Sequence, residues 1–306
     1  MRPRALRPGD RIGICAPAGP VDLERLERGA AELRALGFDV LVPEGIDART
    51  GFTAGSVERR LAELHRLFAD EAVAGIVCAR GGAGAGWLLD KLDGELLRSH
   101  PKLLVGYSDV TFLHLYLARL GMASVHGPMA ARELADGSYD KASFRHALTG
   151  EGAPYSSEPE DLEPLRKGEA EGVLRGGCLS ILAAASGTPW ALDTTPSDTI
   201  LFLEDVDERP YRIDRMLLQL RRSGALDGVR GVVFGDMRGC SPKLPEDHRL
   251  QDVLLQALDG LDVPIALGLS SGHAASPAVT LPLGVRARLA CGGEDARFEV
   301  LEPGVA

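Results

Sequence analysis

The chain has 306 residues, and its 34 Lys and Arg against 44 Asp and Glu give a formal net charge of −10. A protein that holds nucleic acid through phosphate contacts needs a basic surface, so this balance argues against that class. Hydrophobic residues make up 45% and charged residues 25%, which is typical of a folded protein of one large domain or two. The 37 glycines and 19 prolines predict many turns, as an α/β protein with short connections has.

The cysteine pattern bears on disulfides and metal sites, and the N-terminus bears on the cellular location. No C-x-x-C pair occurs and no His lies at metal-ligand spacing from a Cys, so we expect neither a disulfide framework nor a zinc site. We also expect no cofactor. The basic N-terminus is interrupted by Arg11 and by Gly and Pro, and no 18-residue apolar run follows. The sequence therefore predicts no signal peptide, no membrane span and a cytoplasmic location.

The first half of the chain alternates short apolar runs with amphipathic stretches. Strands are predicted at residues 11–16, 38–42, 73–79 and 103–107, and helices at 23–36, 57–68, 87–92 and 109–120. The strands are apolar throughout rather than alternating, which is typical of a parallel sheet covered on both faces.

The pattern fails between residues 149 and 171, where proline and acidic residues occur without apolar periodicity. We interpret this stretch as a surface excursion or as a linker between an N-terminal domain, 1–148, and a C-terminal domain, 172–306. The second domain begins with a small-residue segment at 176–186. Strands are predicted at 199–204, 231–234 and 265–269, helices at 213–220 and 250–258, and short strands around a Gly292-Gly293 turn within 278–300.

Ser108 lies between an apolar strand and an amphipathic helix, in the segment Gly106-Tyr107-Ser108-Asp109. α/β-hydrolases place a nucleophile at such a turn, where helix N-terminal N–H groups face a developing oxyanion. On position alone, Ser108 is equally a helix N-cap. Val110 also stands where the second glycine of G-x-S-x-G would be, so that pattern is only half met.

A glycine-rich turn, residues 80–86, follows the strand at 73–79. Its backbone can approach an anion closely, or it is simply a tight turn that needs positive φ. It matches neither G-x-G-x-x-G nor a P-loop. Because ligands of open α/β sheets bind outside the carboxyl ends of the strands, this turn and Ser108 point to one site. The amides of Gly82 and Asp109 are candidates for an oxyanion hole.

A serine nucleophile needs a base, and the base needs an orienting partner. His126 and His273 occupy turn positions after apolar segments and are candidates, although either is also readable as a structural histidine. The other five histidines fall in charged or amphipathic stretches and are expected on the surface or on a helix face: His65, His100, His114, His146 and His248. Glu204 ends an apolar strand, where a buried carboxylate is costly unless paired. The acidic residues directly after it look like solvated loop residues, without being excluded: Asp205, Asp207 and Glu208.

Taken together, these motifs resemble the LD-carboxypeptidase family of serine peptidases, which includes muramoyltetrapeptide carboxypeptidases. The resemblance covers nearly the whole chain, because the motifs occur in the family's order. They are Gly9-Asp10-Arg11-Ile12-Gly13-Ile14, Ala16-Pro17-Ala18-Gly19, Ala79-Arg80-Gly81-Gly82, Gly106-Tyr107-Ser108-Asp109, His126-Gly127-Pro128, Gly176-Gly177-Cys178-Leu179-Ser180, Gly187-Thr188-Pro189, Phe202-Leu203-Glu204-Asp205, Tyr211-Arg212-Ile213-Asp214-Arg215-Met216-Leu217 and Gly268-x-x-x-Gly272-His273.

The resemblance implies a flavodoxin-like parallel-sheet N-terminal domain, a β-rich α/β C-terminal domain and an active site at the domain interface. It implies a triad of Ser108 as nucleophile, His273 as base and Glu204 as the orienting residue, with no metal. The implied reaction removes the terminal D-Ala of a cytoplasmic murein tetrapeptide in peptidoglycan recycling. The implied partners are this peptide and a second copy of the chain in a homodimer, with no nucleic acid and no membrane.

Arg80 and Gly81 are candidates for substrate binding, because a carboxypeptidase must hold a free carboxylate and a guanidinium can do so in bidentate fashion. The alternative for Arg80 is an ion pair. Arg175 and Arg209 are weaker candidates. Two positions depart from the family pattern, Ala83 where many members have an aromatic and Cys178 where Asn often follows Gly-Gly. Cys178 is interpreted as a buried small residue.

Two other functions stay open. Microcin C immunity-type peptidases share the fold and triad but cleave peptidyl or acyl-sulfamoyl adenylates. Arg80 before Gly81-Gly82 and the compact length favour the murein enzyme. A non-catalytic ligand-binding protein of the same fold is the second alternative, and the presence of all three triad residues argues against it.

Overall fold

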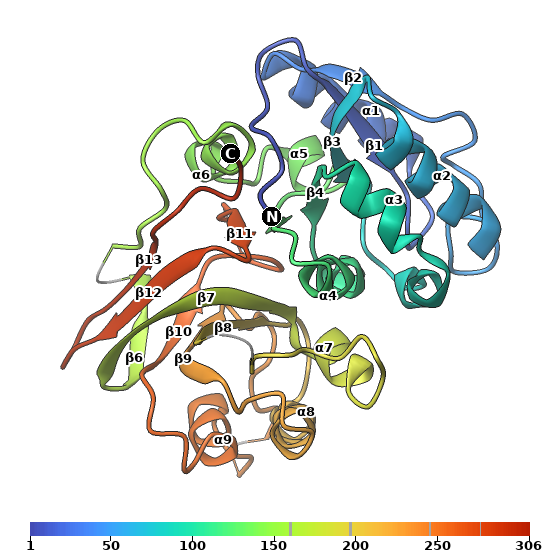
Figure 1. The fold of residues 1–306 in the computed structure, drawn as a ribbon. Coiled ribbons are helices and arrows are strands. Elements are labelled where there is room, and N and C mark those ends of the chain that lie inside the picture. Colours follow the sequence, from blue (N-terminus) through green and yellow to red (C-terminus); the bar gives the residue numbers. More distant parts are fainter. Residues whose placement is uncertain (159–160, 196–197, 245, 276) are drawn as a thin grey trace. The chain divides into compact units, whose positions relative to one another are not determined.

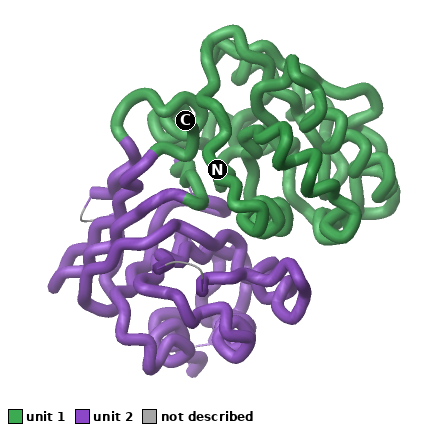
Figure 2. The backbone as a smooth tube through the Cα atoms, viewed as in Figure 1, with its two compact units in different colours: residues 1–153, 278–284, 303–306 green, residues 154–277, 285–302 purple. Residues whose placement is uncertain are grey.

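The computed structural model describes residues 1–158, 161–195, 198–244, 246–275 and 277–306. It divides into two compact units (Figure 2). Unit 1 contains residues 1–153, 278–284 and 303–306, and unit 2 contains residues 154–277 and 285–302. Two parts of the expected C-terminal segment, 278–284 and 303–306, thus fold with the N-terminal unit.

Unit 1 contains a mostly parallel sheet (Figure 1). Its strands are β1 (Arg11–Cys15), β2 (Asp39–Leu41), β3 (Val73–Cys78), β4 (Leu103–Gly106), β5 (Ser124–His126) and β11 (Leu281–Leu283). The order is β2-β1-β3-β4-β5-β11, in which only β11 is antiparallel to its neighbour. The first five strands follow the flavodoxin-like order, so the predicted fold class is confirmed.

Side-chain caps precede four of the helices in the described part of unit 1. They are α1 (Leu23–Ala35), α2 (Val57–Ala69), α3 (Gly94–Ser99), α4 (Thr111–Arg119), α5 (Glu133–Asp136) and α6 (Lys141–Thr149). The side chains of Asp22 and Ser56 accept backbone N–H groups in the first turns of α1 and α2. The helix predicted at 87–92 is instead a 3₁₀ helix, η1 (Ala85–Lys91), because the Asp93 carboxylate caps a new helix, α3, directly after it.

The core of unit 1 lies between its sheet and α1. Ile12, Val77, Val105 and Val125 come from four neighbouring strands, and each is at most 1% exposed. Leu26, Ala30 and Leu33 lie on the buried side of α1 at helical spacing. Burial of these side chains stabilises the packing of the sheet against α1 by about 25 cal/mol per Å² of apolar surface. This packing keeps the strand ends at fixed relative positions.

Unit 2 is built on a β-rich mixed sheet. Its strands are β6 (Glu163–Arg166), β7 (Gly168–Cys178), β8 (Thr199–Glu204), β9 (Val229–Gly235), β10 (Ile265–Leu269), β12 (Arg286–Cys291) and β13 (Ala296–Val300), in the order β13-β12-β7-β8-β9-β10-β6. The four strands from β7 to β10 are parallel and the outer ones antiparallel. The helices α7 (Leu179–Ala185), α8 (Pro210–Arg222) and α9 (Leu250–Ala257) contact one another in that order.

The stretch expected to be a linker, 149–171, contains β6 and the start of β7. Pro164 lies in β6, which pairs with β10 and forms the edge of the sheet. An edge strand tolerates a proline because one side of it needs no ladder hydrogen bonds. Across the described residues, no helix has the length and apolarity that a bilayer crossing needs.

Candidate active site

Ser108 lies in a strained turn at the carboxyl end of β4. Its φ is 64°, one of three positive values among the described non-glycine residues. The left-handed region is costly for a residue with a Cβ, so the surrounding packing must hold it there. A Cβ at Gly106 would lie 3.0 Å from Val110 Cγ1 and 3.1 Å from Cys78 Cβ, so only glycine lets the turn pack this closely against β3.

The N-cap interpretation of Ser108 differs from the structure. The cap of the 3₁₀ turn η2 (Ser108–Val110) is Tyr107, the cap of α4 is Val110, and neither turn has a side-chain cap hydrogen bond. Ser108 cannot act as a β-region cap because its backbone is left-handed. Its side chain is instead partly exposed at the strand-to-helix junction, as a nucleophile's would be.

The glycine-rich turn after β3 lies directly against Ser108. A Cβ at Gly81 would lie 2.8 Å from Ser108 Cβ and 3.0 Å from its Oγ. Gly81 O accepts a hydrogen bond of 3.0 Å from the N–H of Gly19, in the turn after β1. Gly82 has φ 119°, and a Cβ there would lie 3.0 Å from Gly19 Cα. Three turns from neighbouring strands therefore meet at the edge where ligands of such sheets bind.

Arg80 is a cation without an acidic partner among the described residues. Its Nη1 donates to Pro20 O at 3.3 Å, and its buried Nε has no hydrogen-bond partner. Burial lowers the pKa of Arg80, and the nearby charge of Arg132 lowers it further. Among the described residues of unit 1, no carboxylate pairs with Arg80.

Asp109, whose amide is the other oxyanion candidate, has a buried carboxylate. Its Oδ2 accepts the N–H of Ala85 at 2.7 Å, and the residue is 3% exposed. Burial raises the pKa of Asp109 to about 6, against the lowering effects of the Ala85 hydrogen bond and the Arg60 charge. The backbone N–H of Asp109 lies in η2, directly after Ser108.

Three buried histidines occur in the same unit as Ser108. His126 lies in β5, is fully buried, and its ring centroid is 5.6 Å from that of Tyr107. His114 was expected on the surface or a helix face, but it is buried on α4, with Nδ1 2.9 Å from Ser124 Oγ and Nε2 2.8 Å from Gly106 O. Burial lowers the pKa of His114 to about 4. His146, with the same expectation, is also buried.

Glu204 and His273 form a close pair in unit 2. Glu204 ends β8 and is 1% exposed, and its Oε2 accepts His273 Nδ1 at 2.7 Å and the His273 backbone N–H at 3.0 Å. Glycines make room for the carboxylate as it crosses toward the turn after β10. A Cβ at Gly235, at the end of β9, would lie 2.8 Å from Glu204 Cβ, and one at Gly272 would lie 2.6 Å from Glu204 Cδ.

The pair fixes the histidine tautomer. A carboxylate oxygen only accepts, so the His273 Nδ1 carries the proton and donates it to Glu204. In the neutral imidazole, Nε2 is then left as the basic nitrogen. This is the arrangement that a general base of a triad requires.

The acidic residues after Glu204 have other partners. Asp205 is 4% exposed rather than solvated, and its Oδ2 accepts the N–H of Ser180 in the first turn of α7 at 2.7 Å. Burial raises the pKa of Asp205. Glu208 pairs with Arg212 of α8 at 3.3 Å. Asp207 has φ 57° and donates its N–H to Arg238 O, so it shapes the loop.

The weaker candidates, which are Cys178, Arg175 and Arg209, either have an unreactive side chain or lie away from the Glu204–His273 pair. Cys178 is 3% exposed, and burial with the nearby carboxylates of Glu204 and Asp205 raises its thiol pKa well above the usual value, so it is a poor nucleophile. Burial lowers the pKa of Arg175, whose Nε has no hydrogen-bond partner.

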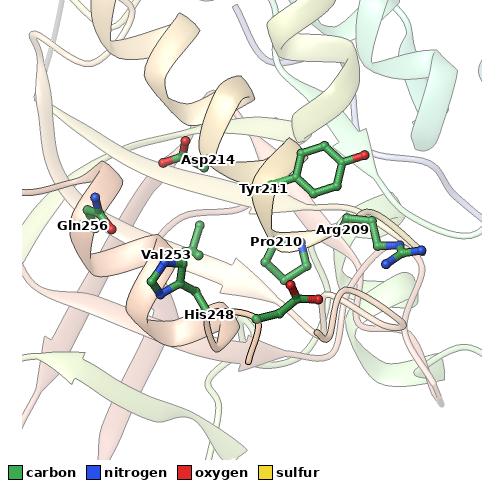
Figure 3. Close-up of a pocket in the computed structure, with 8 residues that line it drawn as sticks. Arg209, Pro210, Tyr211, Asp214, His248, Val253 and Gln256 are labelled. Carbon is green, nitrogen blue, oxygen red and sulfur yellow. The ribbon is translucent and has the colours of Figure 1, made fainter. Parts of the chain in front are cut away.

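Arg209 lines a different cavity of unit 2, of about 260 Å³ (Figure 3). The other lining residues are Pro210, Tyr211, Asp214, Asp247, His248, Val253 and Gln256. Glu204 and His273 are not among them. Within the described residues no three side chains of His, Cys, Asp or Glu gather as ligands of a metal ion would.

The sequence pattern did not indicate two residues that support these turns. Arg60 of α2 is 2% exposed and donates from Nη1 to Pro17 O and Gly84 O. Glu133 accepts the Tyr107 hydroxyl at 2.7 Å. Each of these three contacts joins residues more than 20 positions apart, so no local pattern could have indicated them.

Comparison with known proteins identifies the family. Residues 12–127 match the model of the LD-carboxypeptidase N-terminal domain, and residues 171–289 match that of the C-terminal domain. The probable murein peptide carboxypeptidase of Bacillus subtilis is 37% identical, over 100% of this chain and 95% of that protein. The murein tetrapeptide carboxypeptidase of Pseudomonas aeruginosa is 33% identical, over 87% and 88%.

Solved structures with a similar fold support the same family. The muramoyltetrapeptide carboxypeptidase from Oxalobacter formigenes is 30% identical, with a TM-score of 0.84 over 96% of this chain and 99% of that one. An MccF-like protein from Bacillus anthracis is 27% identical, with a TM-score of 0.86 over 99% of both chains. The chain therefore belongs to the LD-carboxypeptidase family of serine peptidases.

Proposed function

We propose that this protein hydrolyses the amide between the L-configured centre of the diamino acid and the terminal D-Ala of murein tetrapeptides. Ser108 is the nucleophile, His273 the general base and Glu204 the residue that orients it. The observation that carries the proposal is the double hydrogen bond from His273 to Glu204 Oε2, which leaves Nε2 as the base. Relatives named as murein peptide and murein tetrapeptide carboxypeptidases support the substrate class.

The reaction has two half-steps. Ser108 Oγ attacks the carbonyl carbon while His273 Nε2 takes the hydroxyl proton, and the imidazolium then gives that proton to the leaving D-Ala amine. Water attacks the acyl-enzyme in the second half-step and loses its proton to His273, so that Ser108 leaves protonated. Glu204 stabilises the imidazolium in both halves.

The N–H groups of Asp109 and Gly82 bind the oxyanion. Support for Gly82 comes from its peptide with Gly81, whose carbonyl is bonded to Gly19. A trans peptide directs its C=O and N–H to opposite sides, so the N–H of Gly82 points away from Gly19. Arg80, which lacks an acidic partner among the described residues, holds the free carboxylate of the substrate beside Gly81.

The wider setting follows from the same substrate. Murein tetrapeptides released for reuse are cytoplasmic, so the enzyme acts there in peptidoglycan recycling. The family resemblance supports a homodimer. The N-terminal region, 1–148, carries the nucleophile, and the region after the 149–171 segment carries Glu204 and His273.

The test is mass spectrometry of L-Ala-γ-D-Glu-meso-diaminopimelate-D-Ala incubated with the protein and, in parallel, with Ser108→Ala. We expect loss of one D-Ala with the wild type alone. An equal rate for Ser108→Ala would contradict the nucleophile assignment, and an intact tetrapeptide in both would contradict the substrate.

An adenylate-cleaving peptidase is the second candidate, favoured by the structural likeness to an MccF-like protein. Hydrolysis of an acyl-sulfamoyl adenylate with no release of D-Ala from the tetrapeptide would select it. A serine-directed phosphonate that fails to label Ser108, with both substrates intact, would select the non-catalytic ligand-binding alternative.

A further inference from the structure

One peptide unit in the glycine-rich turn is held from both sides by buried, oppositely charged side chains. The C=O of Gly84 accepts Arg60 Nη1 at 2.6 Å, and the N–H of the same peptide, on Ala85, donates to Asp109 Oδ2 at 2.7 Å. Arg60 Nη1 also reaches Pro17 O at 2.7 Å, in the turn after β1. Because the C=O and N–H of a trans peptide point in opposite directions, the two side chains bind opposite edges of the peptide.

The two side chains that hold this peptide are buried, and Gly84 has no room for a side chain. Arg60 is 2% exposed and Asp109 3%, so neither charge is screened by water as a surface pair would be. Gly84 has φ 122°, and a Cβ there would lie 2.7 Å from Thr53 Cγ2 and 2.9 Å from Arg60 Nη1. Any side chain at this position would push the guanidinium away.

The held peptide fixes the far end of the segment that faces Ser108. The near end is fixed by the N–H of Ala79 bonding Cys15 O at 2.7 Å and by Gly81 O accepting from Gly19. Gly81, in the near anchor, lies so close to Ser108 that a methyl group would not fit. Two of the three residues between the anchors are glycines, Gly82 and Gly84, which have little conformational preference of their own, so the orientation of the Gly82 amide depends on both anchors and changes when the Gly84–Ala85 peptide moves.

From this geometry we infer that the side chains of Arg60 and Asp109 are positioning residues, which hold residues 81–85 in the conformation that sets the Gly82 amide and the space around Ser108. The inference rests on the proposed function, because it takes Ser108 as the nucleophile. It assigns the Asp109 side chain a task separate from that of its own backbone N–H. Neither side chain contacts the reacting atoms, so both act through the turn.

The test compares Asp109→Asn, Arg60→Met and the double variant with the wild type and with Arg59→Met. Asp109→Asn keeps the backbone N–H but removes the charge. Arg59 is the neighbour of Arg60 on α2 and pairs with Glu63, so Arg59→Met removes a cation from the same helix while leaving the held peptide intact. The double variant leaves no unpaired buried charge, so it stays folded even where Arg60→Met alone does not.

We expect kcat for the tetrapeptide to fall about 10- to 100-fold in Asp109→Asn and in the double variant, with KM within about twofold, because an oxyanion donor out of place weakens transition-state binding. The rate of Ser108 labelling by a phosphonate should fall in parallel, and Arg59→Met should match the wild type. Hydrogen exchange should quicken at residues 81–85 while the β3 and β4 amides stay protected.

A kcat and a labelling rate within twofold of the wild type in both Asp109→Asn and the double variant would overturn the inference. So would an equal fall in Arg59→Met, which would show a general effect of charge on α2. Phosphonate labelling keeps this test separate from the proposed substrate. A wild type that is labelled at Ser108 but releases no D-Ala contradicts the murein substrate and leaves the labelling comparison decisive for the turn.

Discussion

Neighbouring carboxylates at the end of β8 have different partners, and this separates catalysis from stability at the scale of single residues. Glu204 Oε2 accepts two hydrogen bonds from His273, whereas Asp205 accepts the N–H groups of Ser180 and Val206. Both side chains are buried, so exposure alone does not distinguish them. What distinguishes them is the direction in which alternate residues of an extended chain point.

Glu204→Gln should lower kcat by about 10³- to 10⁴-fold. An amide in place of the carboxylate no longer stabilises the imidazolium and can present its NH₂ to Nδ1, which favours the wrong histidine tautomer. Steady-state release of D-Ala from the tetrapeptide measures the effect.

Asp205→Asn is the matched control for Glu204→Gln. It should keep kcat within about twofold of the wild type and change the free energy of unfolding by less than about 1 kcal/mol, since the Asn side-chain oxygen can still accept the N–H of Ser180. The reverse result, a large fall in kcat for Asp205→Asn only, would show that Asp205 and not Glu204 has the orienting role.

At the scale of elements, the strands and helices with strong periodicity could be predicted from the sequence alone. The predicted strands at 199–204 and 265–269 coincide with β8 and β10, and the predicted helix at 250–258 differs from α9 by one residue. The helix predicted at 213–220 begins earlier, at Pro210, because proline at the first helical position needs no N–H partner. The short β5 and the edge strand β6 were missed, since three or four residues carry too little pattern.

The candidate site could be predicted in part. Residue type and position at strand ends indicated Ser108 and the glycine turn, which lie together in unit 1, and Glu204 and His273, which pair in unit 2. Position alone left His126 as open a candidate as His273. The burial of Asp205 and His114, and the contacts of Arg60, depend on packing between distant elements. No local sequence pattern specifies such contacts.

The β4–α4 turn contains two buried groups whose titrations oppose each other. The pKa of His114 is lowered from 6.5 to about 4, so its contribution to stability is lost as the pH falls from about 6.5 to 4, where the unfolded chain binds the extra proton. The pKa of Asp109 is raised from 3.8 to about 6, so its contribution is lost as the pH rises from about 4 to 6. At 1.36 kcal/mol per pKa unit, each effect is about 3 kcal/mol.

Replacing one of the two groups should therefore leave the effect of the other on the pH dependence of stability uncompensated. Asp109→Asn should lose stability on acidification from pH 6.5 to 4 more steeply than the wild type does, by up to about 3 kcal/mol, and His114→Gln should lose less. Urea unfolding at intervals of half a pH unit measures both slopes. Parallel stability curves for the wild type and Asp109→Asn would show that this carboxyl titrates at its ordinary pKa.

At the scale of the whole molecule, the chain enters each unit more than once. Unit 1 is completed by residues 278–284 and 303–306, which follow most of unit 2 in the sequence. The strand β11 pairs with β5 and covers the edge of the parallel sheet, and Leu281 is fully buried. An open edge beside β5 would otherwise present unpaired backbone groups. Unit 1 therefore cannot complete its sheet from residues 1–153 alone.

Residues 303–306 give this dependence a direct test. Val305 is 2% exposed, the N–H of Ala306 donates to Pro3 O, and Ala306 O accepts the N–H of Ala5, each at 2.9 Å. Deleting the four residues exposes the apolar site of one valine and removes two backbone hydrogen bonds, which together should lower the free energy of unfolding by about 3 kcal/mol. Urea unfolding followed by far-ultraviolet circular dichroism gives the difference. Glu294→Ala, in the exposed turn between β12 and β13, serves as the control and should leave the midpoint unchanged. Equal midpoints for the deletion and the wild type would mean that unit 1 is stable without residues 303–306, whereas a lower midpoint would show that the stability of unit 1 depends on residues that follow unit 2 in the sequence.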